Sequence, residues 1–304
     1  MFICSQAAKL DYRKKAQGGS DSSLRDELTV VTAFFNIGPL QKADRDYYQW
    51  MKTFAHIDNP LIIYVDSDVE KKTFTEIRKY YPSNRTLIIK LAQEEMWAFK
   101  LVPRIDRIFR LPGYPQFQPN TVNAKYSAAM HAKYEVMEMS VRANPFKTNY
   151  FCWVDVGLFR SMPRKAYNDT TARFGVYLPK NFRPSEVAYS HVRVRNPKLT
   201  PMEIVAQQGV WVCGCFFVAR SDVMLRWTAE YRAATEKLIR DEIMSTDQQV
   251  IYAMFNAMSP SISLQLYPSD GRYNEWFHLG YISRDAQAER IQRKSATTLP
   301  TPAH

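Results

Sequence analysis

Residues 150–160 read YFCWVDVGLFR, an apolar run of aromatic and β-branched side chains that ends in Asp155, Val156 and Gly157. Such a run predicts a buried strand. The exit of that strand carries one carboxylate and a glycine that leaves the backbone bare. In open α/β sheets, ligands bind outside the carboxyl ends of the strands. We therefore expect Asp155 to lie at a ligand-binding edge, and the alternative is that it only caps the following turn.

Composition indicates a folded, basic protein. The chain has 304 residues, 46% of them hydrophobic, and a formal net charge of +11. The basic residues are scattered rather than gathered in a block, which favours phosphate-bearing ligands over nucleic acid. Residues 1–28 lack an apolar stretch long enough for a signal peptide or a membrane span. We expect a cytoplasmic or peripherally membrane-associated protein, or a protein of the secretory lumen if an N-terminal anchor was removed.

Cysteine usage fits a reducing compartment. Cys4, Cys152, Cys213 and Cys215 show no Cys/His spacing typical of a zinc site. Cys213 and Cys215 would point to one face of a strand, and neighbours at that spacing rarely form a disulfide.

The first half of the chain alternates strand patterns with helix patterns. Apolar runs predict strands, and amphipathic segments between them predict helices. The strands are expected at 29–37, 61–65, 86–91 and 150–156, and the helices at 41–57, 70–80, 92–101 and 121–141. This alternation predicts an α/β fold with a mostly parallel sheet and helices on both faces.

The second half is less regular. We expect strands at 174–178, 209–219 and 262–267, helices at 221–240 and 245–256, and a proline-containing surface excursion at 179–202. Ser245 followed by Gln248 resembles a capping box, which predicts Ser245 as the N-cap of the last helix. Residues 1–28 are predicted to be a flexible leader and 284–304 a disordered tail, flanking one domain at 29–283.

Familiar phosphate-binding loops are missing from the sequence. No Gly-x-Gly-x-x-Gly follows the first strand, and neither a Walker lysine loop nor a Gly-x-Ser-x-Gly elbow is present. A phosphate ligand must therefore be held by side chains or by a metal ion. Lys125 and Lys133 lie on one side of the predicted 121–141 helix, within roughly 80° of each other, and either could reach a diphosphate.

Three further segments offer candidate ligands. Asp247 and Gln248 open a helix and could hydrogen-bond a sugar-like polyol, or they could only cap that helix. His278 lies among aromatic residues and could bind a metal ion, although a lone histidine in such surroundings is more often a core residue. Asp66 follows the second strand and could contact a nucleotide, and Asp66 with Asp68 could also hold a metal ion.

Several of these stretches together resemble the HtrL/YibB-like family. The resemblance rests on TVVTAFFNIG at 29–38, MHAKY at 130–134 and FCWVDVGLFR at 151–160. That family is similar to the GT-A class of glycosyltransferases. The resemblance thus implies a GT-A-like, Rossmann-like fold, with residues 29–157 as the nucleotide-sugar half and 158–283 as the acceptor half.

The resemblance implies transfer of a sugar from a nucleotide-sugar donor to a glycan or another hydroxyl acceptor. The residues implied for catalysis are Asp247 and Gln248, and those implied for donor binding are Asn36, Asp66, Lys125, Lys133, Asp155 and Gly157. A divalent cation, Mn²⁺ or Mg²⁺, would be held by Asp155 and His278.

One departure from the GT-A pattern leaves open whether the site requires a metal ion. GT-A enzymes usually carry Asp-x-Asp at the metal-binding strand, and here Gly157 takes the place of the second aspartate. A metal-free site, with Lys133 and Arg160 on the phosphates, is the alternative to the cation. A non-catalytic carbohydrate- or nucleotide-binding module and a basic nucleic-acid-binding protein remain as alternative functions.

Overall fold

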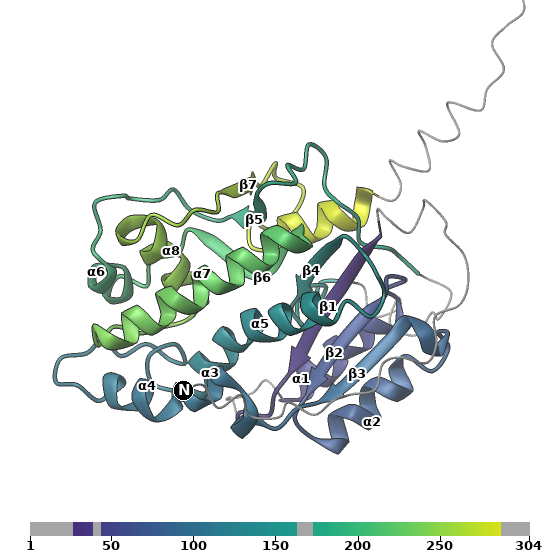
Figure 1. Ribbon diagram of the computed structural model, residues 1–304, viewed down its shortest axis with the longest axis horizontal. Coiled ribbons are helices and arrows are strands. Elements are labelled where there is room, and N and C mark those ends of the chain that lie inside the picture. The colour runs from purple at the N-terminus through teal and green to yellow at the C-terminus, as the bar shows by residue number, and fades with distance from the viewer. Residues whose placement is uncertain (1–26, 39–43, 163–172, 287–304) are drawn as a thin grey trace, which may run out of the picture.

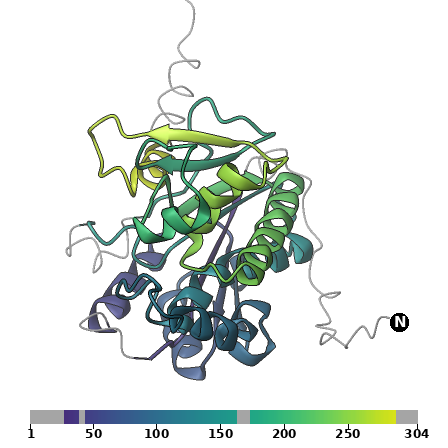
Figure 2. The same cartoon turned by 90° about the vertical axis from the view of Figure 1, so that its left-hand side faces the viewer.

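The computed structural model describes residues 27–38, 44–162 and 173–286. The predicted leader at 1–28 and tail at 284–304 lie largely outside these residues. Figure 2 places the first half of the chain, in purple to blue, at one end of the molecule and the green-to-yellow second half at the other.

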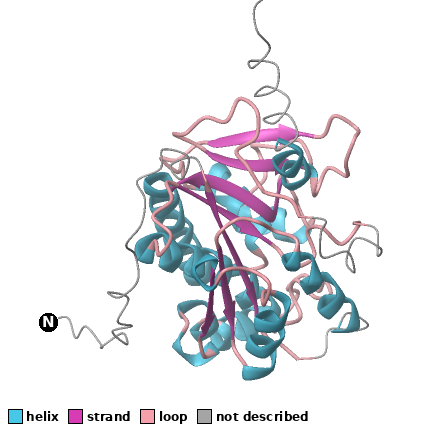
Figure 3. Cartoon of the chain, turned by 90° about the vertical axis from the view of Figure 1, so that its right-hand side faces the viewer, coloured by secondary structure: helices cyan, strands magenta, loops and turns pink. Residues whose placement is uncertain are grey.

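A seven-stranded sheet runs through the described residues, in the order β3-β2-β1-β4-β6-β5-β7. Each strand is parallel to its neighbours except β6, which is antiparallel to β4 and β5. Figure 3 shows the twist of the sheet, as the magenta strands turn from steep to nearly level. The predicted Rossmann-like α/β fold class, with a mostly parallel sheet, is confirmed. The strands are β1 (Leu28–Phe34), β2 (Leu61–Val65), β3 (Thr86–Lys90), β4 (Tyr150–Val154), β5 (Val187–His191), β6 (Val212–Arg220) and β7 (Leu264–Pro268).

Helices cover both faces of this sheet (Figure 1). Alternate strand residues face opposite cores, so that Val31 and Trp153 belong to one and Val30 and Cys152 to the other. Burial on both faces explains why the inner strands β1, β2, β4 and β6 read as continuous apolar runs. The α-helices are α1 (Asp44–Met51), α2 (Asp68–Ile77), α3 (Trp97–Lys100), α4 (Val102–Phe109), α5 (Ala124–Ala143), α6 (Pro201–Ala206), α7 (Ser221–Arg240) and α8 (Asp247–Ala257), with 3-10 turns η2 (Lys52–Ala55), η3 (Ser83–Arg85) and η4 (Gln93–Glu95).

Helix α5 is the element that carries a charge into the interior. Its N-cap Asn123 accepts a hydrogen bond from the Tyr126 amide (3.0 Å), and Asn144 ends it in a left-handed conformation with φ of 34°. α5 packs against β1, β4 and α7, so most of its surface is buried. Lys133 lies in the middle of this buried surface, with only 4% of its area exposed.

Two predictions for the middle of the chain are wrong. Residues 174–178 form no strand, since only an isolated bridge joins Phe174 to Ile57. The segment 179–202 is not a surface excursion throughout, because it contains β5, which lies inside the sheet between β6 and β7. The polar side chain of Ser190 in β5 is buried because its Oγ accepts a hydrogen bond from the Leu279 amide (3.0 Å).

The expected helix at 92–101 is also shorter and differently placed. A 3-10 turn and the four-residue α3 take its place, and α4 follows, with Pro103 at one of its first helical positions. Proline is tolerated there because the first helical amides have no partner within the helix. In the part of the chain that the structure describes, no helix is both long and apolar enough to cross a membrane.

Candidate functional site

A cleft opens where the strand order of the sheet reverses. β1 is followed by β2 on one side, whereas β4 joins its other side, so the segments leaving β1 and β4 diverge. Ligands of open α/β sheets bind at such a point. The first pocket lies there, and its lining includes residues from the end of β1 and the loop that follows it (33–38) and from the end of β4 and the segment that follows it (within 153–160).

A second pocket continues the cleft toward α8. It is lined by Asp247, Gln248, Asn274 and Trp276, among others. The cavity volumes are about 270 Å³ for the first pocket and 350 Å³ for the second, near the lower end of the roughly 300–1,000 Å³ typical of small-molecule sites. The two pockets share Tyr126, Met130, Lys133, Asp155, Arg160, Cys215 and Phe277, so they form one continuous cleft.

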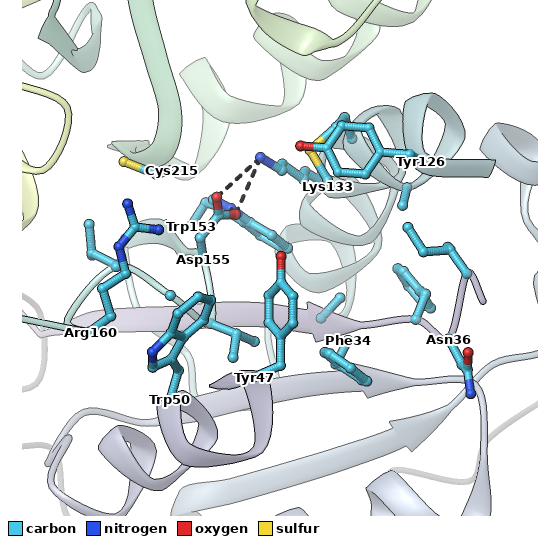
Figure 4. Close-up of a pocket in the computed structure, with 18 of the residues that line it drawn as sticks. Phe34, Asn36, Tyr47, Trp50, Tyr126, Lys133, Trp153, Asp155, Arg160 and Cys215 are labelled. Atoms are coloured by element: carbon cyan, nitrogen blue, oxygen red, sulfur yellow. Dashed lines mark hydrogen bonds and ion pairs between the residues drawn. The ribbon is translucent and has the colours of Figure 1, made fainter. Parts of the chain in front are cut away.

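Lys133 and two carboxylates meet where the pockets join. Lys133 Nζ lies 3.3 Å from Asp155 Oδ1 and 3.3 Å from Asp247 Oδ2, and it donates to the Gly214 carbonyl at 3.2 Å. Figure 4 shows Lys133 reaching from its helix toward Asp155, with Tyr126 beside it. Three residues far apart in the sequence therefore form one charged cluster, which we call the Asp–Lys–Asp cluster.

Asp155 is fixed by its backbone and by its neighbour on β4. Its amide donates to the Cys215 carbonyl (2.9 Å), and Trp153 Nε1 donates to Asp155 Oδ1 (2.5 Å). The Asp155 side chain retains 32% exposure, so one face of the carboxylate is open to the cleft. A carboxylate that is oriented but not sealed is suited to binding a ligand.

Helix α8 begins one residue later than predicted, and this register brings Asp247 into the cluster. Thr246, not Ser245, is the N-cap, and its capping-box partner is Gln249, not Gln248. This register places Asp247 at the first helical position and leaves Gln248 in the lining of the second pocket. A Cβ on Gly214 would lie only 1.9 Å from Asp247 Oδ2, so the absence of a side chain there makes room for the carboxylate.

Burial and charge oppose each other in the cluster. Burial lowers the pKa of Lys133, but the carboxylates of Asp155 and Asp247 outweigh it and hold that pKa above its ordinary value. Burial raises the pKa of Asp247, which Lys133 only partly offsets. Burial also raises the pKa of the neighbouring Tyr126 hydroxyl to about 12, so it remains a hydrogen-bond donor.

Aromatic side chains form one wall of the first pocket. Phe34, Tyr47 and Trp50 line it, and Tyr47 and Trp50 contact each other edge to face, with ring centroids 4.9 Å apart. The Arg160 guanidinium lies over the rings of Trp50 and Phe277, at 5.5 Å and 4.5 Å from their centroids. Figure 4 shows Trp50 and Tyr47 below Asp155 and Arg160 beside it. A flat ring and an anionic group could both find contacts here.

Asp66 acts behind the pocket rather than in its lining. Its Oδ2 accepts hydrogen bonds from the Asn36 amide (2.9 Å) and from Gln93 Nε2 (2.5 Å), and Gln93 Nε2 also donates to the Asn36 carbonyl (2.8 Å). These contacts fix the loop after β1, and Asn36 on that loop lines the first pocket. Asp66 therefore holds the loop that contributes Asn36.

The structure gathers most of the predicted site residues and separates two of them. Asn36, Lys133, Asp155, Gly157, Asp247 and Gln248 line the cleft. Lys125 is exposed and lines neither pocket. His278 is buried outside the cleft lining, where its Nδ1 lies 3.8 Å from Asp270 Oδ1.

Metal ligation by Asp155 and His278 does not fit this arrangement. His278 faces Asp270, while Asp155 faces the Lys133 ammonium. Within residues 27–38, 44–162 and 173–286, no cluster of three or more His, Cys, Asp or Glu side chains is arranged to hold a metal ion. Between Asp155 and Asp247, Lys133 occupies the position that a cation shared by two carboxylates would need.

Tyr126, Trp50 and Gly214 were not among the predicted site residues. Gly214 did carry a signal, since a glycine inside a strand often marks close approach of another group. Trp50 belongs to α1, whose packing over the cleft has no local sequence signal.

The first part of the chain matches the model of a known protein family. Residues 26–174 match the model of a family described as "Bacterial protein of unknown function (HtrL_YibB)". This match covers β1, the Lys133 helix and the Asp155 strand, and it confirms the resemblance that those stretches carry. Comparison with curated proteins gives no significant match.

Proposed function

We propose, from the premise that the chain belongs to the HtrL_YibB family through residues 26–174, that it is a GT-A-like glycosyltransferase. In this proposal it transfers a sugar from a nucleotide-sugar donor to a hydroxyl group of a glycan or another acceptor. The observation that carries the proposal is the Asp–Lys–Asp cluster, because it joins an aromatic pocket to a polar one at the switch point of the sheet.

The two pockets suit the two ends of a nucleotide-sugar. The first offers aromatic rings and the loop of Asn36, which suit a nucleoside. The second offers Asp247, Gln248 and Asn274 next to Trp276, and polar groups beside an aromatic ring suit a sugar. A diphosphate between them would lie beside Lys133 and Arg160, the two cations that line both pockets.

The chemistry depends on the departure of the nucleoside diphosphate. Negative charge develops on the leaving phosphate as the bond to the sugar breaks, and fixed cations stabilise that charge. Lys133 is held in place by three contacts, so little reorganisation is needed. Asp247 faces the sugar side, and its raised pKa suits acceptance of a proton from the acceptor hydroxyl if the reaction inverts configuration.

The direct test is donor binding followed by turnover. A panel of nucleotide-sugars is screened by thermal shift, since a ligand at 100 times its Kd stabilises the fold by about 2.7 kcal/mol. The stabilising donor is then assayed for hydrolysis and transfer. Asp155→Ala should fold and lose roughly 100-fold or more of that activity, whereas the exposed Asp68→Ala should retain it. Full activity of a folded Asp155→Ala protein would remove Asp155 from the site.

A second expectation concerns metal ions. Because Lys133 supplies a cation between the carboxylates, we expect donor turnover to persist in excess chelator, within about twofold of the untreated rate. Turnover is measured with EDTA alone and after adding back Mn²⁺ or Mg²⁺. Loss of activity in EDTA with recovery in Mn²⁺ would show that a divalent cation is required, which contradicts this expectation but not glycosyl transfer itself.

Gly157 favours one alternative, a binding module without catalysis. It stands where GT-A enzymes usually carry a second carboxylate, and a Cβ there would lie 3.1 Å from the Trp50 ring. The donor screen separates the two functions, because a module would bind a nucleotide or a sugar and turn over none of the donors.

A further inference from the structure

Two thiols come together in the lining of the second pocket. Cys213 and Cys215 lie on β6, and their Sγ atoms are 2.7 Å apart. A disulfide has an S–S distance of about 2.05 Å. The two sulfur atoms would therefore need to approach by less than about 1 Å to be bonded.

An irregularity in β6 explains why these side chains converge. Residues two apart on a regular strand are separated by roughly 6.6 Å, too far for their sulfur atoms to meet without distortion. In the β5–β6 pairing, Tyr189 is opposite Phe217 but Ser190 is opposite Cys213, so residues 214–216 have no partner on β5. Bulges of this kind bend a strand and redirect its side chains, often beside functional sites.

The same segment holds the charged cluster. The Gly214 carbonyl accepts from Lys133 (3.2 Å), and the Cys215 carbonyl accepts from the Asp155 amide (2.9 Å). Cys215 Sγ also donates to the Trp276 carbonyl (3.0 Å). A bond between the two sulfur atoms would pull on the peptide units that carry these carbonyls, so the oxidation state of the thiols is coupled to the positions of Lys133 and Asp155.

We propose that Cys213 and Cys215 form a reversible disulfide that changes the positions of Lys133 and Asp155 in the cleft. The oxidant class is a low-molecular-weight disulfide, such as glutathione disulfide. One cysteine thiolate attacks the reagent, breaking its S–S bond and releasing one thiol. The second cysteine then attacks the mixed disulfide, forming the Cys213–Cys215 bond and releasing the second thiol. The protein loses two electrons and two protons, which the reagent gains.

Access distinguishes this pair from the third described cysteine. Cys213 and Cys215 line the second pocket, and Cys215 also lines the first. Cys152 lies in the middle of β4, is fully buried and lines neither pocket. Cys213 and Cys215 are 2% and 7% exposed and border the cleft that a reagent enters, whereas Cys152 is 0% exposed and does not border it, which makes Cys152 the matched control.

The experiment uses the full chain with Cys4→Ser, because Cys4 lies outside the described residues. The protein is incubated with glutathione disulfide, alkylated and digested with trypsin, which leaves both cysteines in peptide 199–220. We expect this peptide to be two hydrogens lighter than its reduced form and to carry no alkyl group. Dithiothreitol should restore two alkylation sites.

Variants of single cysteines test whether the link joins Cys213 to Cys215. Cys152→Ala should keep the link, whereas Cys213→Ser and Cys215→Ser should each abolish it. Because the mass of peptide 199–220 is read on the chain that retains all three described cysteines, the answer does not depend on how the variants fold. Complete alkylation of both thiols after oxidant treatment, or a glutathione adduct that persists on one of them, would overturn the proposal. Neither outcome depends on glycosyl transfer.

Discussion

Lys133→Met is expected to destabilise the protein by about 3–5 kcal/mol, because breaking a buried ion pair leaves a buried charge without compensation. Asp247 has only 2% of its area exposed, and Lys133 is its cationic partner at 3.3 Å. Donor turnover should fall by at least roughly 100-fold, the usual effect of removing one group that stabilises developing negative charge. Urea denaturation and a donor-hydrolysis assay measure the two effects separately.

Two further variants distinguish the loss of the Lys133 charge from a general effect of changing a lysine on helix α5. Lys125→Met changes an exposed lysine two turns earlier on α5, and it should alter stability by less than about 0.5 kcal/mol. The double variant Lys133→Met with Asp247→Asn removes both charges, so most of the lost stability should return while activity stays low. If the double variant is as unstable as Lys133→Met alone, the cost comes from lost packing and not from the unpaired carboxylate.

The pH dependence of Lys133→Met follows from Asp247. Burial raises the pKa of this carboxyl in the folded protein, and without Lys133 the opposing attraction is gone. A group with a raised pKa in the folded state binds more protons folded than unfolded, so stability rises as pH falls toward the unfolded pKa of about 3.9. Lys133→Met should therefore be relatively most stable under acid conditions and lose stability as the Asp247 carboxyl ionises.

The strands of the first half could be predicted because β1, β2 and β4 are mostly buried on both faces, and the edge strand β3 still carries an apolar run at 87–89. β2 was predicted at its observed bounds, and β1, β3 and β4 within three residues at either end. β5 could not, since Val187–His191 contains Ser190, whose burial depends on a hydrogen bond to the distant Leu279 amide. Strand patterns reflect packing on neighbours as much as intrinsic preference. The antiparallel direction of β6 likewise has no signal in its own apolar composition.

The charged residues of the site were likewise only partly predictable from the sequence. Asp155 could be predicted from one local pattern, a carboxylate at the end of an apolar strand. The choice between Lys125 and Lys133 could not, because they share a helix face and differ by about 12 Å along the axis, a distance that only the placement of α5 on the sheet resolves. His278 lies in an aromatic segment that suggested a metal ligand, but it lines neither pocket, and its Nδ1 lies 3.8 Å from Asp270 Oδ1.

Gly214→Ala is the second change from which we expect a large effect. The new Cβ would lie 1.9 Å from Asp247 Oδ2 and 2.9 Å from Asp247 Cγ. The carboxylate has little room to move aside, because it is buried and held by Lys133. We expect a loss of about 1–3 kcal/mol, the usual cost of overpacking a core. Donor turnover should also fall sharply, since Lys133 loses its geometry to both Asp247 and the Gly214 carbonyl.

A double-mutant cycle locates the origin of that effect. Asp247→Ala removes the atoms that the new methyl group would meet, so Gly214→Ala should cost much less in that background than in the unmodified protein. Interaction energies of roughly 0.5–3 kcal/mol are usual for residues in contact. Equal costs in both backgrounds would mean that the methyl group disturbs β6 itself. That result would remove the argument that a glycine is needed at position 214 so that Asp247 can reach Lys133.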